Sequence, residues 1–297
     1  MRPLPSLLLP LLLACTSSEP ESRTKEHDVP RPPRTPAPPT GLRLPVSTSD
    51  VPLDLPAHTL FHVTLQGDEI RYGWRNWPNP APELVAERLR ETLTPKIERL
   101  HAGDHFGQLV VHAEADVPFS KVLPVLVASH LARMDHVGFA VTGKTGKRLM
   151  IAMSVPEEWG HWEDPNGLPP RDKPVPTVVM VDHEGYWIAP AGLDPLQLDA
   201  DPAKLQAWAE KFTTDERAKQ GDALDTTTPE PNRVLLRVEP NVTVGHIVAT
   251  LDALRGPNCE FLPAYSGYDV PLTCWLWAVQ IGASPAITGE VKRAAKG

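Results

Sequence analysis

The sequence predicts an α+β protein made of two tandem β-β-α-β-α-β domains, each a small sheet with two helices packed on it. Short runs rich in β-branched and apolar residues predict the strands. Apolar residues spaced three and four apart predict the helices between them. The same order of elements occurs twice along the chain, which places the first domain at residues 57–155 and the second at residues 176–284.

The first domain is centred on residues 109–141. Residues 109–111 are apolar and rich in valine, and the strand that they predict ends in an acidic turn. Asp116 lies in this turn, and aspartate is a residue type that caps helix N-termini well. Residues 122–134 then carry apolar side chains at helical spacing, and residues 137–141 predict the next strand.

A hairpin and a helix precede this central segment. Residues 59–65 and 70–74 predict two strands, joined by a tight turn that contains Gly67. Residues 81–101 predict an amphipathic helix, and residues 149–155 predict a strand that extends the sheet.

The second domain repeats this order with divergent residues. Its predicted strands and helices are, in order, residues 177–181, 186–189, 201–212, 234–238, 242–254 and 273–281, with a loose polar stretch at 213–231. Alignment of the two copies pairs Val110 with Leu235, Glu114 with Glu239, Asp116 with Asn241 and Leu126 with Leu251. The second copy therefore carries an amide in place of the acidic Asp116.

Residues 1–15 are typical of a bacterial lipoprotein signal peptide that ends in a lipobox cysteine. Their leucine-rich run is too short to span a bilayer. Cleavage before Cys15 would leave that cysteine as the lipid-modified N-terminus; the alternative is a plain secretory signal with a chance cysteine. Thr16, rather than an aspartate, follows the cysteine, and by analogy with lipoprotein sorting in enteric bacteria this favours the outer membrane. The proline-rich residues 16–56 predict a disordered tether, and residues 285–297 a C-terminal tail.

The composition excludes some classes of function. The chain has 297 residues, 41% of them hydrophobic, and its net charge of −8 argues against nucleic-acid binding. Of its three cysteines, lipidation of Cys15 leaves Cys259 and Cys274. These two predict a disulfide in an oxidising compartment, with two free buried thiols as the alternative.

The sequence predicts no catalytic residues, no metal site and no cofactor. Residues 138–145 match the phosphate-loop pattern, but a strand rather than a helix is predicted to follow them. His101 and His105 lie four apart, but Gly103 interrupts the helix between them. Glu114 and Asp116 could act as paired carboxylates, although a strand end and a helix cap explain them as well.

Two tryptophans mark a predicted linker loop at residues 156–175. Trp159 and Trp162 either form an interaction surface or seal this loop onto a core. Together with Asp116, they are the interaction residues that the sequence suggests.

The hairpin at Gly67 and Asp68, the helix at 81–101 and the segment VVHAEADVPFSKVLPVLVASHLARMDHVGFAV resemble the periplasmic domain of the ExbD/TolR family of biopolymer-transport proteins. The resemblance covers residues 57–143, and Asp116 occupies the family's acidic position at the strand end. It implies a domain that dimerises and, in TolR, contacts peptidoglycan or other envelope proteins. Family members carry a transmembrane helix with an essential aspartate, which this sequence does not predict, so a motor stator is not expected.

The expected protein is a non-enzymatic cell-envelope lipoprotein, anchored through Cys15 and facing the periplasm. Its two domains would pair within one chain as an internal pseudo-dimer and serve as a binding or scaffold component of an envelope or transport complex. The alternatives are an extracytoplasmic enzyme and a small-ligand binding protein, each using a cleft between the domains.

Overall fold

The computed structural model of the chain describes residues 41–48, 60–67, 69–73, 75–78, 80–102, 107–134, 136–154, 177–190, 193–220, 233–262, 270–272 and 274–283. These residues belong to one compact unit, Arg34–Gly297. Across the described ranges the protein is α+β, with four helices, a mixed sheet of twelve strands and a separate two-stranded sheet. The predictions for residues 1–40, for the loop with Trp159 and Trp162 and for the tail at 285–297 concern residues outside the described ranges.

The first series of elements forms one end of the large sheet. Its members are β2 (Leu60–Gln66), β3 (Glu69–Tyr72), β4 (Arg75–Pro78), α1 (Pro82–His101), β5 (Gln108–Ala113), α2 (Phe119–Leu131), β6 (His136–Gly143) and β7 (Arg148–Ser154). Strand β2 pairs antiparallel with β3 and parallel with β5, and β5 pairs parallel with β6. Strand β7 returns antiparallel to β6.

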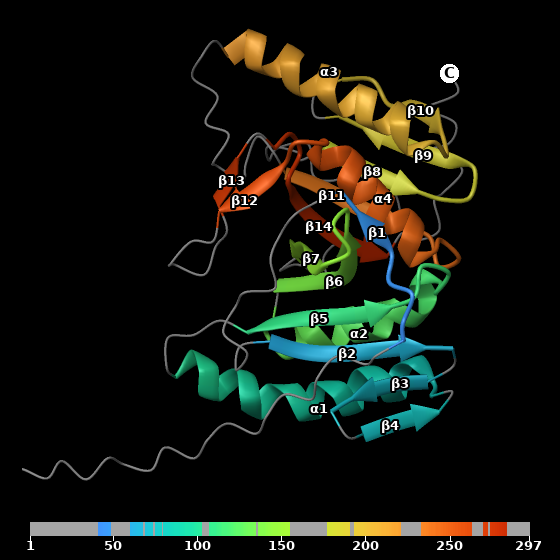
Figure 1. The fold of residues 1–297 in the computed structure, drawn as a ribbon, viewed down its shortest axis with the longest axis vertical. Helices are drawn as coiled ribbons and strands as arrows, with labels where there is room; N and C mark the ends of the chain where they lie inside the picture. Colours follow the sequence, from blue (N-terminus) through green and yellow to red (C-terminus); the bar gives the residue numbers. More distant parts are fainter. Residues whose placement is uncertain are drawn as a thin grey trace, which may run out of the picture. The chain divides into compact units, whose positions relative to one another are not determined.

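The second series follows the same order at the other end of the sheet. Its members are β8 (Thr177–Val181), β9 (Gly185–Ala189), β10 (Leu196–Asp199), α3 (Pro202–Gln220), β11 (Arg233–Val238), α4 (Val244–Arg255) and β14 (Ala278–Ala283). Strands β12 (Glu260–Leu262) and β13 (Val270–Leu272) form the separate antiparallel pair. The large sheet runs β10-β9-β8-β11-β14-β7-β6-β5-β2-β3-β4, so that β4-β3-β2-β5-β6 is matched by β10-β9-β8-β11-β14 (Figure 1).

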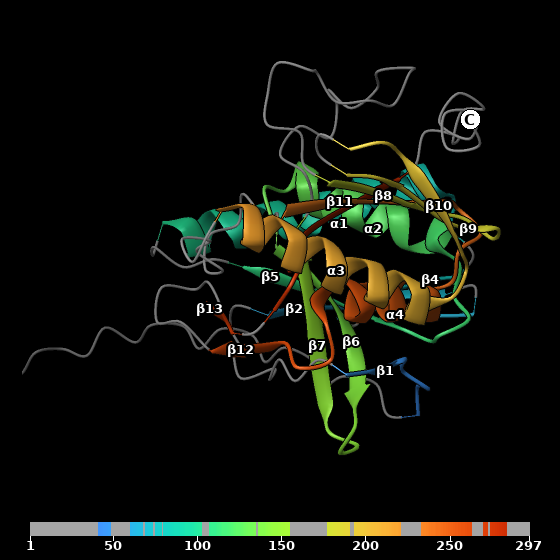
Figure 2. The same ribbon diagram turned by 90° about the horizontal axis from the view of Figure 1, so that it is seen from above.

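One continuous apolar core includes side chains from all four helices. Helix α1 contributes Val85, Leu89, Leu93 and Ile97, which recur at the helical spacing that the sequence predicts. Helix α1 lies beside α2, and α3 lies beside α4 (Figure 2). The largest buried cluster is therefore shared by both series, and each series adds only a small apolar cluster of its own.

Several element boundaries differ from the predictions. Strands β4 and β10, each of four residues, add a third strand to both hairpins. Helix α3 continues to Gln220 through a stretch that was predicted to be loose, because charged pairs support it: Lys211 lies 2.5 Å from Asp215, and Lys219 lies 2.6 Å from Glu216. Strand β14 begins at Ala278 rather than at 273.

The predicted disordered tether at 16–56 is wrong for residues 41–48. Strand β1 (Val46–Ser47) pairs parallel with Thr142 and Gly143 of β6. Leu44 is 8% exposed and packs in a second apolar cluster, with Leu60, Val110, Ala140 and Met150. The apolar spacing of Leu42 and Leu44 explains this ordering, because both leucines pack on one face of the sheet.

Candidate functional site

The turns that precede α2 and α4 meet and exchange backbone hydrogen bonds. Turn residues 114–118 follow β5, and turn residues 239–243 follow β11. The bonds are Phe119 N–H to Val242 O, Val244 N–H to Val117 O, Ser120 N–H to Pro240 O and Gly245 N–H to Ala115 O, each 2.8 Å. An isolated antiparallel bridge between Pro118 and Thr243 lies at the centre of this junction.

These bonds provide acceptors for the N–H groups at the start of both helices. The first N–H groups of a helix have no partner inside the helix and must find an acceptor elsewhere. Here each helix start receives carbonyl groups from the turn before the other helix. The backbone of one series thus caps the helix of the other.

The N-cap predicted at Asp116 is therefore wrong. The N-cap residue of α2 is Pro118, which makes no side-chain cap hydrogen bond, and Asp116 is exposed. A side-chain cap is not required, because Val242 O and Pro240 O accept the N–H groups of Phe119 and Ser120. Helix α4 adds a weak side-chain cap, since Thr243 Oγ1 accepts from His246 N–H at 3.4 Å.

The junction is closely packed. Phe119 and Val244 are fully buried, and Val117 and Val242 are 5% and 6% exposed. Gly245 permits the approach of the two backbones, because a Cβ atom at this position would lie 3.0 Å from Ala115 O. The contact between the two series is therefore apolar and closely packed on its buried side, whereas Ala115 and Pro240 are exposed at its outer side.

The N-terminal segment 41–48 makes a second connection between the two series. Ser47 Oγ donates to Asp252 Oδ1 of α4 at 2.8 Å, and Thr48 N–H donates to Asp252 Oδ2 at 2.9 Å. Because β1 also pairs with β6, this segment joins the first series to helix α4 of the second.

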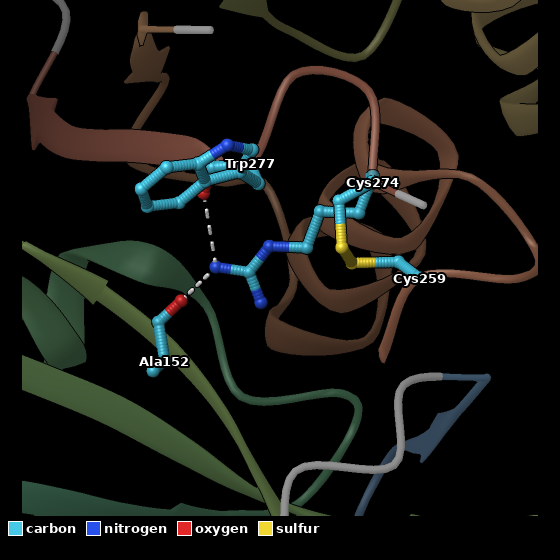
Figure 3. Close-up of a disulfide and its surroundings, with 5 residues drawn as sticks. Ala152, Cys259, Cys274 and Trp277 are labelled. Atoms are coloured by element: carbon cyan, nitrogen blue, oxygen red, sulfur yellow. Dashed lines mark hydrogen bonds between the residues drawn. A yellow bond between two sulfur atoms is a disulfide. The ribbon is translucent and has the colours of Figure 1, made fainter. Parts of the chain in front are cut away.

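Arg255 makes the third connection, next to a cysteine pair that lies within the second series. The Arg255 guanidinium, 2% exposed, donates to Ala152 O of β7 and, at 3.4 Å, to Trp277 O (Figure 3). The sulfur atoms of Cys259 and Cys274, the pair that the sequence predicted to be a disulfide, lie 2.06 Å apart, at bonding distance. This bond ties the loop after α4 to the segment that leads into β14.

A histidine pair, of which His112 is buried and His62 partly buried, lies on the sheet face that residues 41–48 help to cover. His62 Nδ1 and His112 Nε2 are 2.8 Å apart, so one ring donates its proton to the other. His112 is 1% exposed, and its Nδ1 has no hydrogen-bond partner among the described residues. Burial, with the charges of His62 and Arg148, lowers the pKa of His112 to about 3. His112 is therefore neutral at physiological pH.

The other motifs occupy ordinary positions. Residues 138–145 form most of β6 and the start of the turn into β7, so the phosphate-loop pattern is followed by a strand and not by a helix. Glu114 Oε1 accepts from Arg43 N–H at 3.5 Å, whereas Asp116 points to solvent from the exposed part of the turn. In the described ranges no three His, Cys, Asp or Glu side chains gather as metal ligands. None of the described helices combines the length and the apolar character that a membrane crossing requires.

The fold and the junction define this chain as an α+β protein. Its two series of elements share one large sheet and are joined by reciprocal capping of two helices. No family model, no curated protein and no solved structure matches the chain.

Proposed function

We propose that this chain is a non-enzymatic cell-envelope lipoprotein whose two ExbD/TolR-like domains pair within one chain. In this proposal the paired domains form an internal pseudo-dimer that acts as a binding or scaffold component of an envelope or transport complex. The lipid at Cys15 would hold it at the membrane, facing the periplasm. Envelope proteins or peptidoglycan would be its partners.

The reciprocal capping bonds carry this proposal. Phe119 corresponds to Val244, and Val117 to Val242, by the same offset that aligns Asp116 with Asn241. Each bond from the first turn to the second therefore has a counterpart in the opposite direction between the equivalent residues. Residue i contacting j while j contacts i is the mark of a two-fold interface between identical subunits. A duplicated domain that keeps its dimer contact inside one chain accounts for this pattern.

The strand registers support the duplication. Val63 of β2 pairs with Tyr72 and Val111, and Val179 of β8 pairs with Ile188 and Leu236. The offset that aligns Asp116 with Asn241 therefore also aligns Val111 of β5 with Leu236 of β11, while β2 and β3 match β8 and β9 at an offset of their own. The buried junction favours a scaffold over an enzyme that works in a cleft between the domains, because apolar side chains and backbone groups fill the contact.

The anchor is tested by intact mass and membrane partition of the protein from its native host, beside a Cys15→Ser variant. We expect a lipid-modified mass at Cys15 and loss of membrane association in the variant. An unmodified, soluble wild-type protein would contradict the anchor. The pseudo-dimer is tested separately by light scattering, with a monomer as the expected result and a stable homodimer through the same turns as the contradicting one.

A further inference from the structure

Helix α1 and the β3–β4 hairpin bring together a lysine and a tyrosine at the end of the large sheet. Lys96 Nζ donates to Tyr72 Oη at 2.8 Å. Tyr72 is 7% exposed, and Lys96 is half-buried. The ammonium also lies over the Tyr72 ring, 4.7 Å from the ring centroid.

The surroundings of Lys96 are cationic. Burial, followed by the charges of Arg99 and Arg75, lowers the pKa of Lys96. Among the described residues no carboxylate pairs with its ammonium. Lys204 shows the usual arrangement for comparison, because Asp199 pairs with it and raises its pKa. A half-buried lysine that has no carboxylate partner among the described residues is an unfavourable arrangement, and such groups concentrate at functional sites.

Lys96 and Tyr72 touch directly, and Arg99 lies one helical turn after Pro95 and three residues after Lys96 on the same helix. Lys96 uses one N–H for Tyr72 and keeps two. Burial raises the pKa of Tyr72 to about 12, so its hydroxyl keeps a proton that it can donate while it accepts from Lys96. Arg99 Nε donates to Pro95 O at 3.0 Å, which fixes the guanidinium and leaves its terminal nitrogens to donate elsewhere. Arg75 Nη1 is held by Thr92 Oγ1 at 2.8 Å.

We propose that Lys96, Tyr72 and Arg99 form a binding site for a compact oxyanion, a carboxylate or a phosphate group carried by a ligand of the chain. The anion would take the remaining protons of Lys96 and the hydroxyl proton of Tyr72, while Arg99 and Arg75 add charge. Charge-assisted hydrogen bonds of this kind are the strong ones. The site lies away from the junction of the capping turns and is independent of the lipid anchor and of the pseudo-dimer.

The second series lacks this site. In β3, Tyr72 pairs with Val63 of β2. At the corresponding position of β9, Ile188 pairs with Val179 of β8. An apolar side chain cannot hold a lysine ammonium or donate to an anion. The site therefore belongs to the first series alone and gives the two ends of the sheet different binding properties.

The purified full chain is titrated with inorganic phosphate and, separately, with acetate, at constant ionic strength, by isothermal titration calorimetry. We expect saturable binding of at least one anion, weakened roughly tenfold by Lys96→Gln and about fivefold by Tyr72→Phe. Lys204→Gln, which removes an ordinary paired lysine, should leave binding unchanged. Binding of phosphate alone or of acetate alone assigns the site to that group.

Two results overturn the proposal. One is the absence of saturable binding of both anions to the wild-type chain. The other is equal affinity of wild type and Tyr72→Phe, because that variant keeps the ring and its packing and loses only the hydroxyl. Should Lys96→Gln fail to fold, as judged by circular dichroism, Tyr72→Phe decides the question by itself.

Discussion

At the scale of single residues, the contact between His62 and His112 makes the free energy of unfolding depend on pH. The pKa of His112 is lowered to about 3 in the folded chain, from an ordinary value of 6.5, and burial lowers the pKa of His62 as well. A lowered histidine pKa means that the unfolded chain binds the proton more tightly. Stability from this group is therefore complete above about pH 6.5 and is lost as the pH falls toward 3, by at most about 1.4 kcal/mol per pH unit.

Urea unfolding of wild type and His112→Leu between pH 7.5 and pH 4 measures this effect. We expect the free energy of unfolding of wild type to fall more steeply with acid than that of the variant. Carboxylates titrate in both proteins, so the difference between the two slopes isolates the histidine. Equal slopes would show that the pair does not control the response to acid.

Gly245 is the residue on which the close approach of the two turns depends. A Cβ atom there would lie 3.0 Å from Ala115 O and 3.1 Å from Ala115 Cβ, so a valine must push the turns apart. We expect Gly245→Val to destabilise the chain by about 2 kcal/mol. Ser120→Val, at the equivalent and exposed position, should change stability by less than about 0.5 kcal/mol. Thermal unfolding of both variants checks the contrast, and equal losses would contradict it.

At the scale of elements, β1 is held by α4 through one carboxylate. Asp252 accepts from Ser47 Oγ and from Thr48 N–H, so Asp252→Ala removes both acceptors and should release residues 41–48 from α4. We expect a loss of about 1–3 kcal/mol and faster amide hydrogen exchange in this segment. Asp215→Ala, which breaks an exposed pair in α3, should cost less than about 1 kcal/mol and leave exchange at 41–48 unchanged. Unchanged exchange in Asp252→Ala would contradict the role of the carboxylate.

Elements with strong apolar periodicity were predictable from the sequence, and those held by other means were not. Helix α1 was predicted to within one residue, because Val85, Leu89 and Leu93 mark its buried face. Strands β4 and β10 have only four residues each, too few for alternation to identify them. The polar end of α3 depends on ion pairs and buries little, so periodicity does not reveal it.

The junction was the least predictable part of the site. Its bonds run from backbone to backbone between segments far apart in the sequence, and backbone groups carry no residue-specific signal. The one trace in the sequence is Gly245, where the first series has Ser120 at the corresponding position. The cysteine pair, in contrast, was predictable from residue count alone, because only Cys259 and Cys274 remain once Cys15 is assigned to the lipid.

For the whole molecule, the shared core determines how the chain unfolds. Buried residues of both series belong to one apolar cluster, and the capping bonds, Asp252 and Arg255 link the series at three further points. Unfolding one series would expose the core of the other and leave the first N–H groups of its helix without acceptors. We therefore expect a single cooperative transition, with equal calorimetric and van't Hoff enthalpies, in differential scanning calorimetry.

Gly245→Val should lower the temperature of this transition without splitting it, because the core still joins the two series. Two transitions in the wild-type chain would mean that the series unfold independently and that the junction contributes little to stability. Two transitions only in the variant would instead identify the capping turns as the contact that couples them. A pseudo-dimer needs coupling between its halves. The number of transitions of the wild-type chain therefore tests the proposed internal pairing.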